Sequence, residues 1–439
     1  MTRCRRLYYQ YASPSQFTLN FVKQRVKGAT SLQSSRPTSL WEHKFDVDVQ
    51  AKLAWRSNFY HIISDEVVNV AIAGRDRYTE RRLMPVDIHK NLEVQYAYTE
   101  AIDFGRPTEV APDIFWVRMP LELTGLNHIN LWLLRDGAGW SIVDTGMRSD
   151  KIRDLWESVF ADFLEGRPVT RVICTHFHPD HIGQAGWLTR KWDCPLWMTH
   201  REWLQGRVAE FDQHDTVPDW HVAYFRKAGL SETALSAMAK SSYRHFSSAV
   251  TPLPPQVHSV QETEDIVIGG RKWRVIIGRG HSPEHMCLFN SDTKVLISGD
   301  QILPKITPHI GVHASDPDAN PLQLYLDTLT NFDHLPEDTL VLPSHGLPFY
   351  RLHPRLAFLR QHHDHRLMVL EDFCREPTKV LSTLKVMFSR QLNEYEALLG
   401  MSEAVSHLHF LMGQGRIIRE ANENGVWRYW ATGRRADAA

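Results

Sequence analysis

Short apolar runs, many of them followed by a turn rich in Gly, Asp or Pro, recur along the chain and predict β-strands. The runs cover 114–117, 129–134, 140–143, 170–174, 195–198, 273–277, 295–298 and 340–342. Helical segments separate several of these strands, and this alternation predicts an α/β fold with buried sheets.

Helices are predicted in three segments between the predicted strands. Apolar side chains at 152–164 recur every three or four residues, which predicts a helix with one buried face that ends near Gly166. A second helix is expected at 182–192, directly after a strand. Residues 201–250 are helical in composition and stand between the two groups of strands, so they are predicted to form a cap over a binding site.

The carboxy-terminal residues 351–439 are predicted to form a separate small domain. Helices are expected first and a hairpin with a turn at 422–425 follows, and the elements are 353–373, 378–388, 402–412, 416–418 and 426–430. Helix, helix and hairpin is the order of a winged helix, so a winged-helix-like domain is predicted.

The amino-terminal region differs from the rest in composition. Residues 1–41 contain no Asp or Glu, but Arg and Lys are interleaved with Ser, Thr and Gln. This composition suits a mitochondrial transit segment, a basic disordered arm, or translated sequence upstream of a later start such as Met84. We therefore assign 1–83 to a basic, poorly ordered extension.

Composition narrows the class of protein. The chain has 439 residues, 43% hydrophobic and 23% charged, which is typical of a soluble globular protein with a large core. No apolar run reaches membrane-spanning length, and a formal net charge of −1 predicts neither nucleic-acid nor membrane binding. The five cysteines are scattered without a C-x-x-C pair, which favours reduced thiols and a cytoplasmic location, with the mitochondrion as the alternative.

The stretch after the strand 170–174 is rich in metal-ligand side chains. His176, His178, Asp180 and His181 place three imidazoles and a carboxylate within a few residues. The first two histidines lie on the same side of an extended segment, and the following helix start lets the other two residues converge with them. Imidazole and carboxylate suit zinc and also manganese or iron, so a metal site is predicted.

The pattern His-x-His-x-Asp-His after a strand resembles the signature of the metallo-β-lactamase superfamily of hydrolases. Other segments resemble further positions of that family, in the family's order. They are Asn130, Asp144-Thr145-Gly146, Gly280-His281-Ser282-Pro283, Gly299-Asp300 and Pro343-Ser344-His345-Gly346. The chain departs from many relatives at Glu284, where they have Gly. The resemblance implies an αββα sandwich over 84–350, with 201–250 as its cap and the metals at one edge.

The resemblance also implies roles for individual residues. Two metals, expected to be zinc, would be held by His176, His178 and His281, by Asp180, His181 and His345, and by Asp300 as a bridge between them. Asn130, Asp144 and His285 are expected to support these ligands. Arg279 and Lys305 are candidates for anchoring a carboxylate or phosphate of the substrate.

Two adjacent divalent ions would lower the pKa of a shared water and supply a bridging hydroxide as nucleophile. Asp180 could orient this hydroxide and accept its proton. We therefore expect a hydrolase that cleaves an ester, thioester or lactone of a small molecule, as in the glyoxalase II-like branch of the family.

A metal-dependent endoribonuclease acting on single-stranded RNA is the alternative function. The predicted tail is similar to that of mitochondrial lactamase-like endoribonucleases. Its surplus of Lys and Arg over Asp and Glu is small, however, whereas phosphate binding draws on a concentrated basic face. The small-molecule substrate is therefore favoured, with the tail as a packing or homodimer element and no membrane partner.

Overall fold

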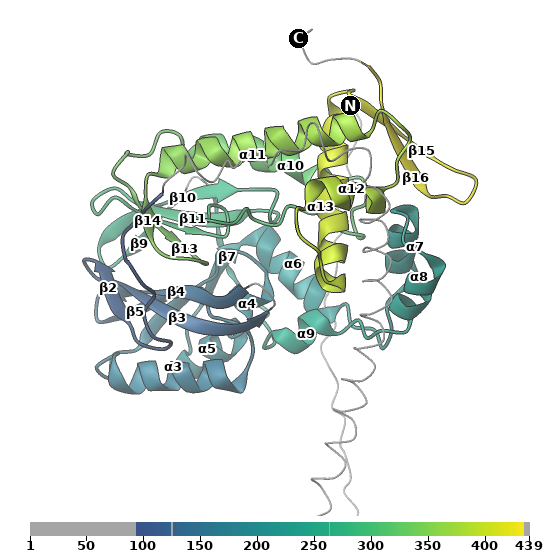
Figure 1. The fold of residues 1–439 in the computed structure, drawn as a ribbon. Helices are drawn as coiled ribbons and strands as arrows, with labels where there is room; N and C mark the ends of the chain where they lie inside the picture. Colours follow the sequence, from purple (N-terminus) through teal and green to yellow (C-terminus); the bar gives the residue numbers. More distant parts are fainter. Residues whose placement is uncertain (1–93, 124–125, 263, 434–439) are drawn as a thin grey trace, which may run out of the picture. The chain divides into compact units, whose positions relative to one another are not determined.

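The computed structural model describes residues 94–123, 126–262 and 264–433 (Figure 1). The predicted extension 1–83 lies outside the described residues. Within the described ranges, no helix combines the length and the apolar character needed to cross a bilayer.

Seven strands form sheet 1, in the order β2-β3-β4-β5-β6-β7-β8. They are β2 (Thr108–Ala111), β3 (Ile114–Leu123), β4 (Leu126–Asp136), β5 (Gly139–Val143), β6 (Val169–Ile173), β7 (Leu196–Thr199) and β8 (His258–Val260). Pairing is antiparallel from β2 to β5 and parallel from β5 to β8.

Sheet 2 also has seven strands, in the order β1-β14-β13-β12-β11-β10-β9. They are β1 (Gln95–Tyr96), β9 (Asp265–Ile268), β10 (Arg271–Gly278), β11 (His285–Asn290), β12 (Val295–Gly299), β13 (Leu340–Pro343) and β14 (Phe349–Tyr350). Only β12 and β13 pair in parallel, and α10 (Pro321–Leu329) and the 3₁₀ turn η2 (Thr330–Phe332) lie between them in sequence.

The two sheets pack face to face, and alternation along their strands shows how. Trp273, Val275 and Ile277 of β10 belong to the core between the sheets, together with Trp116 and Trp132 of sheet 1. The neighbouring Ile276 of β10 belongs instead to the core on the outer side of sheet 2. Because successive side chains of a strand point to opposite faces, both faces of these strands are buried. This burial explains why the predicted strands read as nearly continuous apolar runs.

Helices α3 (Asp150–Asp162), α4 (Pro179–Ile182) and α5 (Ala185–Trp192) cover the outer face of sheet 1. The Ser149 side chain caps α3 by accepting a hydrogen bond from the Ile152 N–H. The helix predicted at 182–192 forms as α5, which begins three residues later than expected because Gly183 and Gln184 separate it from α4. A Cβ atom at Gly183 would lie 2.5 Å from the Arg148 nitrogen, so the close approach of this backbone requires glycine there.

The region predicted as a helical cap contains four helices that divide between two cores. They are α6 (His200–Phe211), α7 (Asp219–Lys227), α8 (Glu232–Ala239) and α9 (His245–Ala249). Trp203 of α6 and Phe246 of α9 pack with the helical side of sheet 1. Val222 of α7 and Leu235 of α8 pack instead with the carboxy-terminal helices.

The carboxy-terminal region contains the predicted order of helices and hairpin. Its elements are α11 (Leu352–Phe373), α12 (Val380–Met387), α13 (Glu394–Gly413), β15 (Ile417–Ala421) and β16 (Trp427–Ala431). Helix α13 begins well before the predicted start at Ser402, because Asn393 and Glu396 form a capping box. Assignment as a winged helix and the domain boundary at residue 350 stay predictions.

A buried arginine joins α11 to the segment that follows β12. The Arg355 guanidinium donates through Nε to the Leu303 carbonyl and through Nη2 to the Ile306 carbonyl, each at 2.6 Å. Burial lowers the pKa of Arg355 to about 10. Leu356 and Leu359 of α11 share one core with sheet 2, so the helix is fixed by polar and apolar contacts together (Figure 1).

Replacing Arg355 by Leu should destabilise the protein by about 2–4 kcal/mol, because two buried carbonyls lose their donors. Arg360→Leu on the same helix is the matched control. Arg360 forms a partly exposed ion pair with Asp333 at 2.9 Å, and its loss should cost less than about 1 kcal/mol. Urea denaturation of both variants measures the difference, and equal costs would contradict a special role for Arg355.

Candidate metal centre

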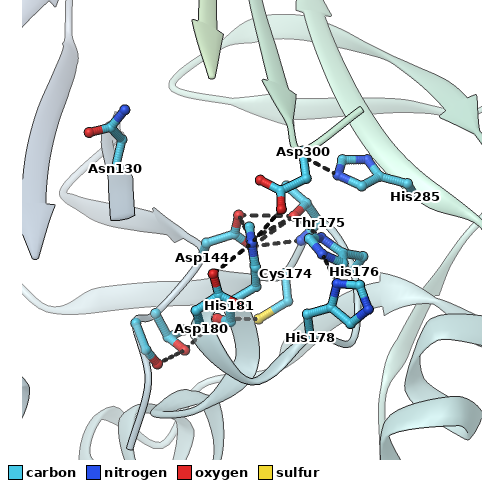
Figure 2. Close-up of polar contacts among 12 residues, drawn as sticks. Asn130, Asp144, Cys174, Thr175, His176, His178, Asp180, His181, His285 and Asp300 are labelled. Atoms are coloured by element: carbon cyan, nitrogen blue, oxygen red, sulfur yellow. Dashed lines mark hydrogen bonds and ion pairs between the residues drawn. The ribbon is translucent and has the colours of Figure 1, made fainter. Parts of the chain in front are cut away.

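The predicted ligand residues come together at one edge of the sandwich, where strands of both sheets end. The His-rich loop, residues 175–183, follows β6, and His281 follows β10. Asp300 follows β12 and His345 follows β13. Figure 2 shows the side chains of Asp300, Asp180 and His181 directed toward one another.

Three histidines form a group that we call the imidazole triad. His176 Nε2 lies 2.9 Å from His178 Nδ1 and 3.2 Å from His281 Nε2. One nitrogen from each ring lies within 4.8 Å of the other two, which is a spacing suited to a single metal ion.

Asp180, His181 and His345 form a second group, the mixed triad, with the same spacing. Asp180 Oδ2 lies 3.6 Å from His181 Nε2 and 3.4 Å from His345 Nε2. This group combines carboxylate and imidazole, whereas the imidazole triad has neutral ligand types only.

Asp300 lies between the two triads. Its Oδ2 is 3.5 Å from His281 Nε2 of the imidazole triad and 3.5 Å from His181 Nε2 of the mixed triad. Its Oδ1 is 3.3 Å from His345 Nε2. One carboxylate therefore contacts ligand atoms of both groups.

The electrostatics of the mixed triad favour a cation. Burial disfavours the charged form of His345, but Asp300 and Asp180 outweigh burial and raise its pKa to about 10. The pKa of His181 is raised well above the ordinary value in the same way, chiefly by Asp180 and Asp144. Carboxylates that attract a proton to these rings attract a divalent metal ion for the same reason.

The hydrogen bonds of the rings leave lone pairs for a metal. His281 Nδ1 and His345 Nδ1 each lie 2.8 Å from a backbone carbonyl, of His309 and His128 respectively. A carbonyl only accepts hydrogen bonds, so Nδ1 donates and Nε2 of the neutral ring carries a lone pair. His345 Nε2 is buried without a hydrogen-bond partner in the described structure, as are His181 Nε2 and Asp300 Oδ1. These donor atoms fit divalent metal ions.

Asp144 and Asn130 hold the ligand loops in place. Asp144 Oδ2 lies 2.8 Å from His181 Nδ1, and its Oδ1 accepts a hydrogen bond from the Thr175 N–H at 2.8 Å. Asn130 Nδ2 donates to the carbonyls of Pro343 and Gly346, on either side of His345, each at 2.8 Å. Both side chains are buried. Asn130 acts on His345 through the backbone on either side of it, and Asp144 acts on His181 through the ring nitrogen Nδ1.

His285 supports the Asp300 carboxylate, because its Nε2 accepts a hydrogen bond from the Asp300 N–H at 3.0 Å.

The two residues predicted to anchor the substrate, Arg279 and Lys305, differ from each other in their surroundings. Arg279 forms ion pairs with Glu262 at 3.7 Å and with Glu284 at 3.6 Å, so its charge is already compensated by carboxylates. Lys305 is exposed.

Sequence reasoning missed Glu202 of α6, which is fully buried beside the ligand loops. Its carboxylate accepts hydrogen bonds from the Phe177 N–H, the Ser282 hydroxyl and the Glu284 N–H. One sequence signal was available, since Glu202, Gly206 and Glu210 recur every four residues and form the buried face of α6. Two carboxylates on a buried helical face require polar partners.

Comparison with known proteins identifies the family of this protein. A sequence profile of the metallo-beta-lactamase superfamily matches residues 124–345. A second profile, of a metallo-beta-lactamase-like C-terminal domain, matches residues 367–432.

Solved structures and curated proteins agree with these profiles. A beta-lactamase domain protein from Burkholderia ambifaria is 39% identical, with a TM-score of 0.72, and the match covers 77% of this chain and 98% of that chain. The probable metallo-hydrolase YqjP of Bacillus subtilis is 23% identical over 324 residues, 72% of this chain and 97% of the relative. The human acyl-coenzyme A thioesterase MBLAC2 is 25% identical over 211 residues, 46% of this chain and 68% of the relative.

The superfamily profile covers the strands of both sheets that end at the site. It also includes all the clustered His and Asp residues. The sandwich predicted from the sequence is confirmed by the fold and by these relatives. The chain belongs to the metallo-beta-lactamase superfamily and is a hydrolase with a candidate metal centre.

Proposed function

We propose that this protein is a dinuclear metal-dependent hydrolase that cleaves acyl thioesters of a small-molecule thiol. The observation that carries the proposal is the pair of triads with Asp300 between them, because each triad has the ligand types and spacing for one ion. The human relative named as an acyl-coenzyme A thioesterase supports the thioester over other acyl substrates.

The proposed ligand assignment follows the geometry. His176, His178 and His281 would hold one metal, Asp180, His181 and His345 the other, and Asp300 would contact both. Zinc is proposed for both positions, since imidazole and carboxylate suit it. When bound, the two ions supply positive charge that polarises a carbonyl oxygen and acidifies water.

Side chains of the protein then hold the reacting groups in place and accept the proton of the attacking water. Asp180 contacts His181 and His345 through the same oxygen, Oδ2, which leaves Oδ1 to accept the proton of an attacking water. His285 and Asp144 keep Asp300 and His181 in place through the hydrogen bonds described above. These contacts orient the groups before the substrate binds, which lowers the cost of reaching the transition state.

The thioester preference also follows from the leaving group. A thiol has a pKa of about 8.5, so a thiolate leaves near neutral pH with little need for a proton donor, whereas an alkoxide requires one. With metal bound, the imidazoles and carboxylates of the centre would serve as ligands, so they would offer no proton donor to a leaving group. A cytoplasmic, reducing location is part of the proposal, because Cys174, Cys194, Cys287 and Cys374 are free thiols.

Zinc-loaded protein should release thiol from members of a panel of acyl-glutathione and acyl-CoA thioesters. Asp180→Ala should reduce the rate by at least about 100-fold, because the variant loses a proposed ligand and the proton acceptor together. Thiol release is measured with a chromogenic thiol reagent. No turnover across the panel by protein with confirmed bound metal would overturn the thioesterase proposal and make labelled single-stranded RNA the next substrate.

Chelator-treated protein should bind two Zn²⁺ per chain and become more stable, by about 2.7 kcal/mol for each site at free zinc one hundred times the dissociation constant of that site. Asp300→Ala should weaken both sites, since its carboxylate contacts both triads. Asp136→Ala is the control, because Asp136 pairs with Arg171 at 2.8 Å on sheet 1. Zinc titration against a chelating dye checks the stoichiometry, and full retention of two ions by Asp300→Ala would refute the shared carboxylate.

A further inference from the structure

Glu202 connects the two loops that carry the imidazole triad. One loop is the His-rich loop, with His176 and His178, and the other is the segment 279–285, which contains His281. We propose that Glu202 is a positioning residue that holds these two loops at the separation that a metal ion in the imidazole triad requires. The inference rests on the proposed metal centre and assigns a role to a residue outside it.

Three hydrogen bonds define the connection. Glu202 Oε2 accepts from the Phe177 N–H at 3.0 Å, and Oε1 accepts from the Ser282 hydroxyl and the Glu284 N–H, each at 2.6 Å. Phe177 stands between His176 and His178, so anchoring its N–H fixes the peptide that joins the two ligands. Ser282 directly follows His281, so the other two bonds fix the third ligand.

Burial of the Glu202 carboxylate is costly, and these three hydrogen bonds offset the cost. Its side chain is fully buried, and burial raises the pKa of its carboxyl to about 7, although the three hydrogen bonds act in the opposite direction. Removing a carboxylate from water is unfavourable unless strong partners satisfy it. Here the partners are two backbone N–H groups and a hydroxyl of the ligand loops, so the carboxylate satisfies donors that would otherwise be buried unpaired.

Helix α6 gives the carboxylate a rigid base. Gly206, one turn after Glu202, packs closely, since a Cβ atom there would lie 3.1 Å from Leu253 Cδ1 and 3.2 Å from Ile182 Cδ1. One turn further, Glu210 accepts a hydrogen bond from the Leu253 N–H at 3.2 Å. The same face of α6 therefore contacts the body of the protein along three successive turns.

The mixed triad is anchored by other groups. Asp144 contacts His181, and the His128 carbonyl contacts His345, as described above. In its ionised form, Glu202 also adds negative charge beside the triad whose own side chains are neutral imidazoles. Loss of Glu202 should therefore weaken one of the two metal sites and spare the other.

The test is zinc titration of Glu202→Gln against a chelating dye. The amide keeps the size of the side chain, but its NH₂ group must face an N–H or hydroxyl donor, and the charge is lost. One of the two zinc ions should bind about 10–100-fold more weakly, the usual effect of changing a residue that supports a ligand, while the other keeps its affinity. Two ions bound with unchanged affinity would overturn the inference.

A double-mutant cycle identifies the affected site. In a His281→Ala background, which already lacks a ligand of the imidazole triad, Glu202→Gln should have no further effect on the remaining ion. In an Asp180→Ala background it should keep its full effect. Equal effects in both backgrounds would show that Glu202 acts on overall folding and would overturn the positioning role.

Glu210→Gln is the matched control, because it makes the same change on the same buried face of α6 without a contact to the ligand loops in the described hydrogen bonds. It should keep both zinc affinities. If Glu202→Gln does not fold, Ser282→Ala removes one of the three bonds and should weaken the same single site several-fold, and an unchanged affinity would overturn the inference. Failure of the wild-type protein to bind zinc would instead refute the proposed function.

Discussion

The shared carboxylate of Asp300 is the contact on which the arrangement of the centre depends. It follows a strand of sheet 2, yet it approaches His181, which is carried by a loop of sheet 1. Placing a buried carboxylate there requires cationic or hydrogen-bonding partners from both sheets. The face-to-face packing of the sheets supplies these partners, and the apolar core between them fixes the distance. The geometry of the polar edge therefore depends on the core, since a shift of either sheet would move His281 and His345 away from the other members of their triads.

Much of this could be predicted from the sequence, for identifiable reasons. The central strands were predictable because both of their faces are buried and their runs are apolar. The short strands β1, β2, β8, β9 and β14 were not predicted, because they lie at or near the sheet edges and are only partly buried, and the buried strand β11 was also missed. The candidate ligands were predictable because the His-rich loop, His281, Asp300 and His345 come after strands and their motifs resemble those of the family. Their grouping in space could not be derived from spacing alone, because His176 and His281 lie far apart in sequence and meet only when the sheets pack.

The differences between prediction and structure have both tertiary and local causes. The helix predicted after the His-rich loop begins later than expected, because Gly183 and Gln184 separate it from the short helix α4. Glu202 escaped notice because its partners are mostly backbone N–H groups, which leave no mark on the sequence. The early start of α13 is a local effect, and the capping box at Asn393 and Glu396 was visible in the residues themselves.

The division of the cap between two cores has a consequence for how this protein can diversify. Helix α6 contacts the ligand loops through Glu202, whereas α7 and α8 pack with the carboxy-terminal helices, and the Tyr224 hydroxyl donates to the Val312 carbonyl at 2.9 Å. Insertions or deletions between Phe211 and Lys240 can therefore alter α7 and α8 while the hydrogen bonds of Glu202 stay in place. Changes within α6 would disturb those hydrogen bonds directly. The helices of the predicted cap and the proposed positioning residue thus lie in adjacent segments that evolution or engineering can alter independently.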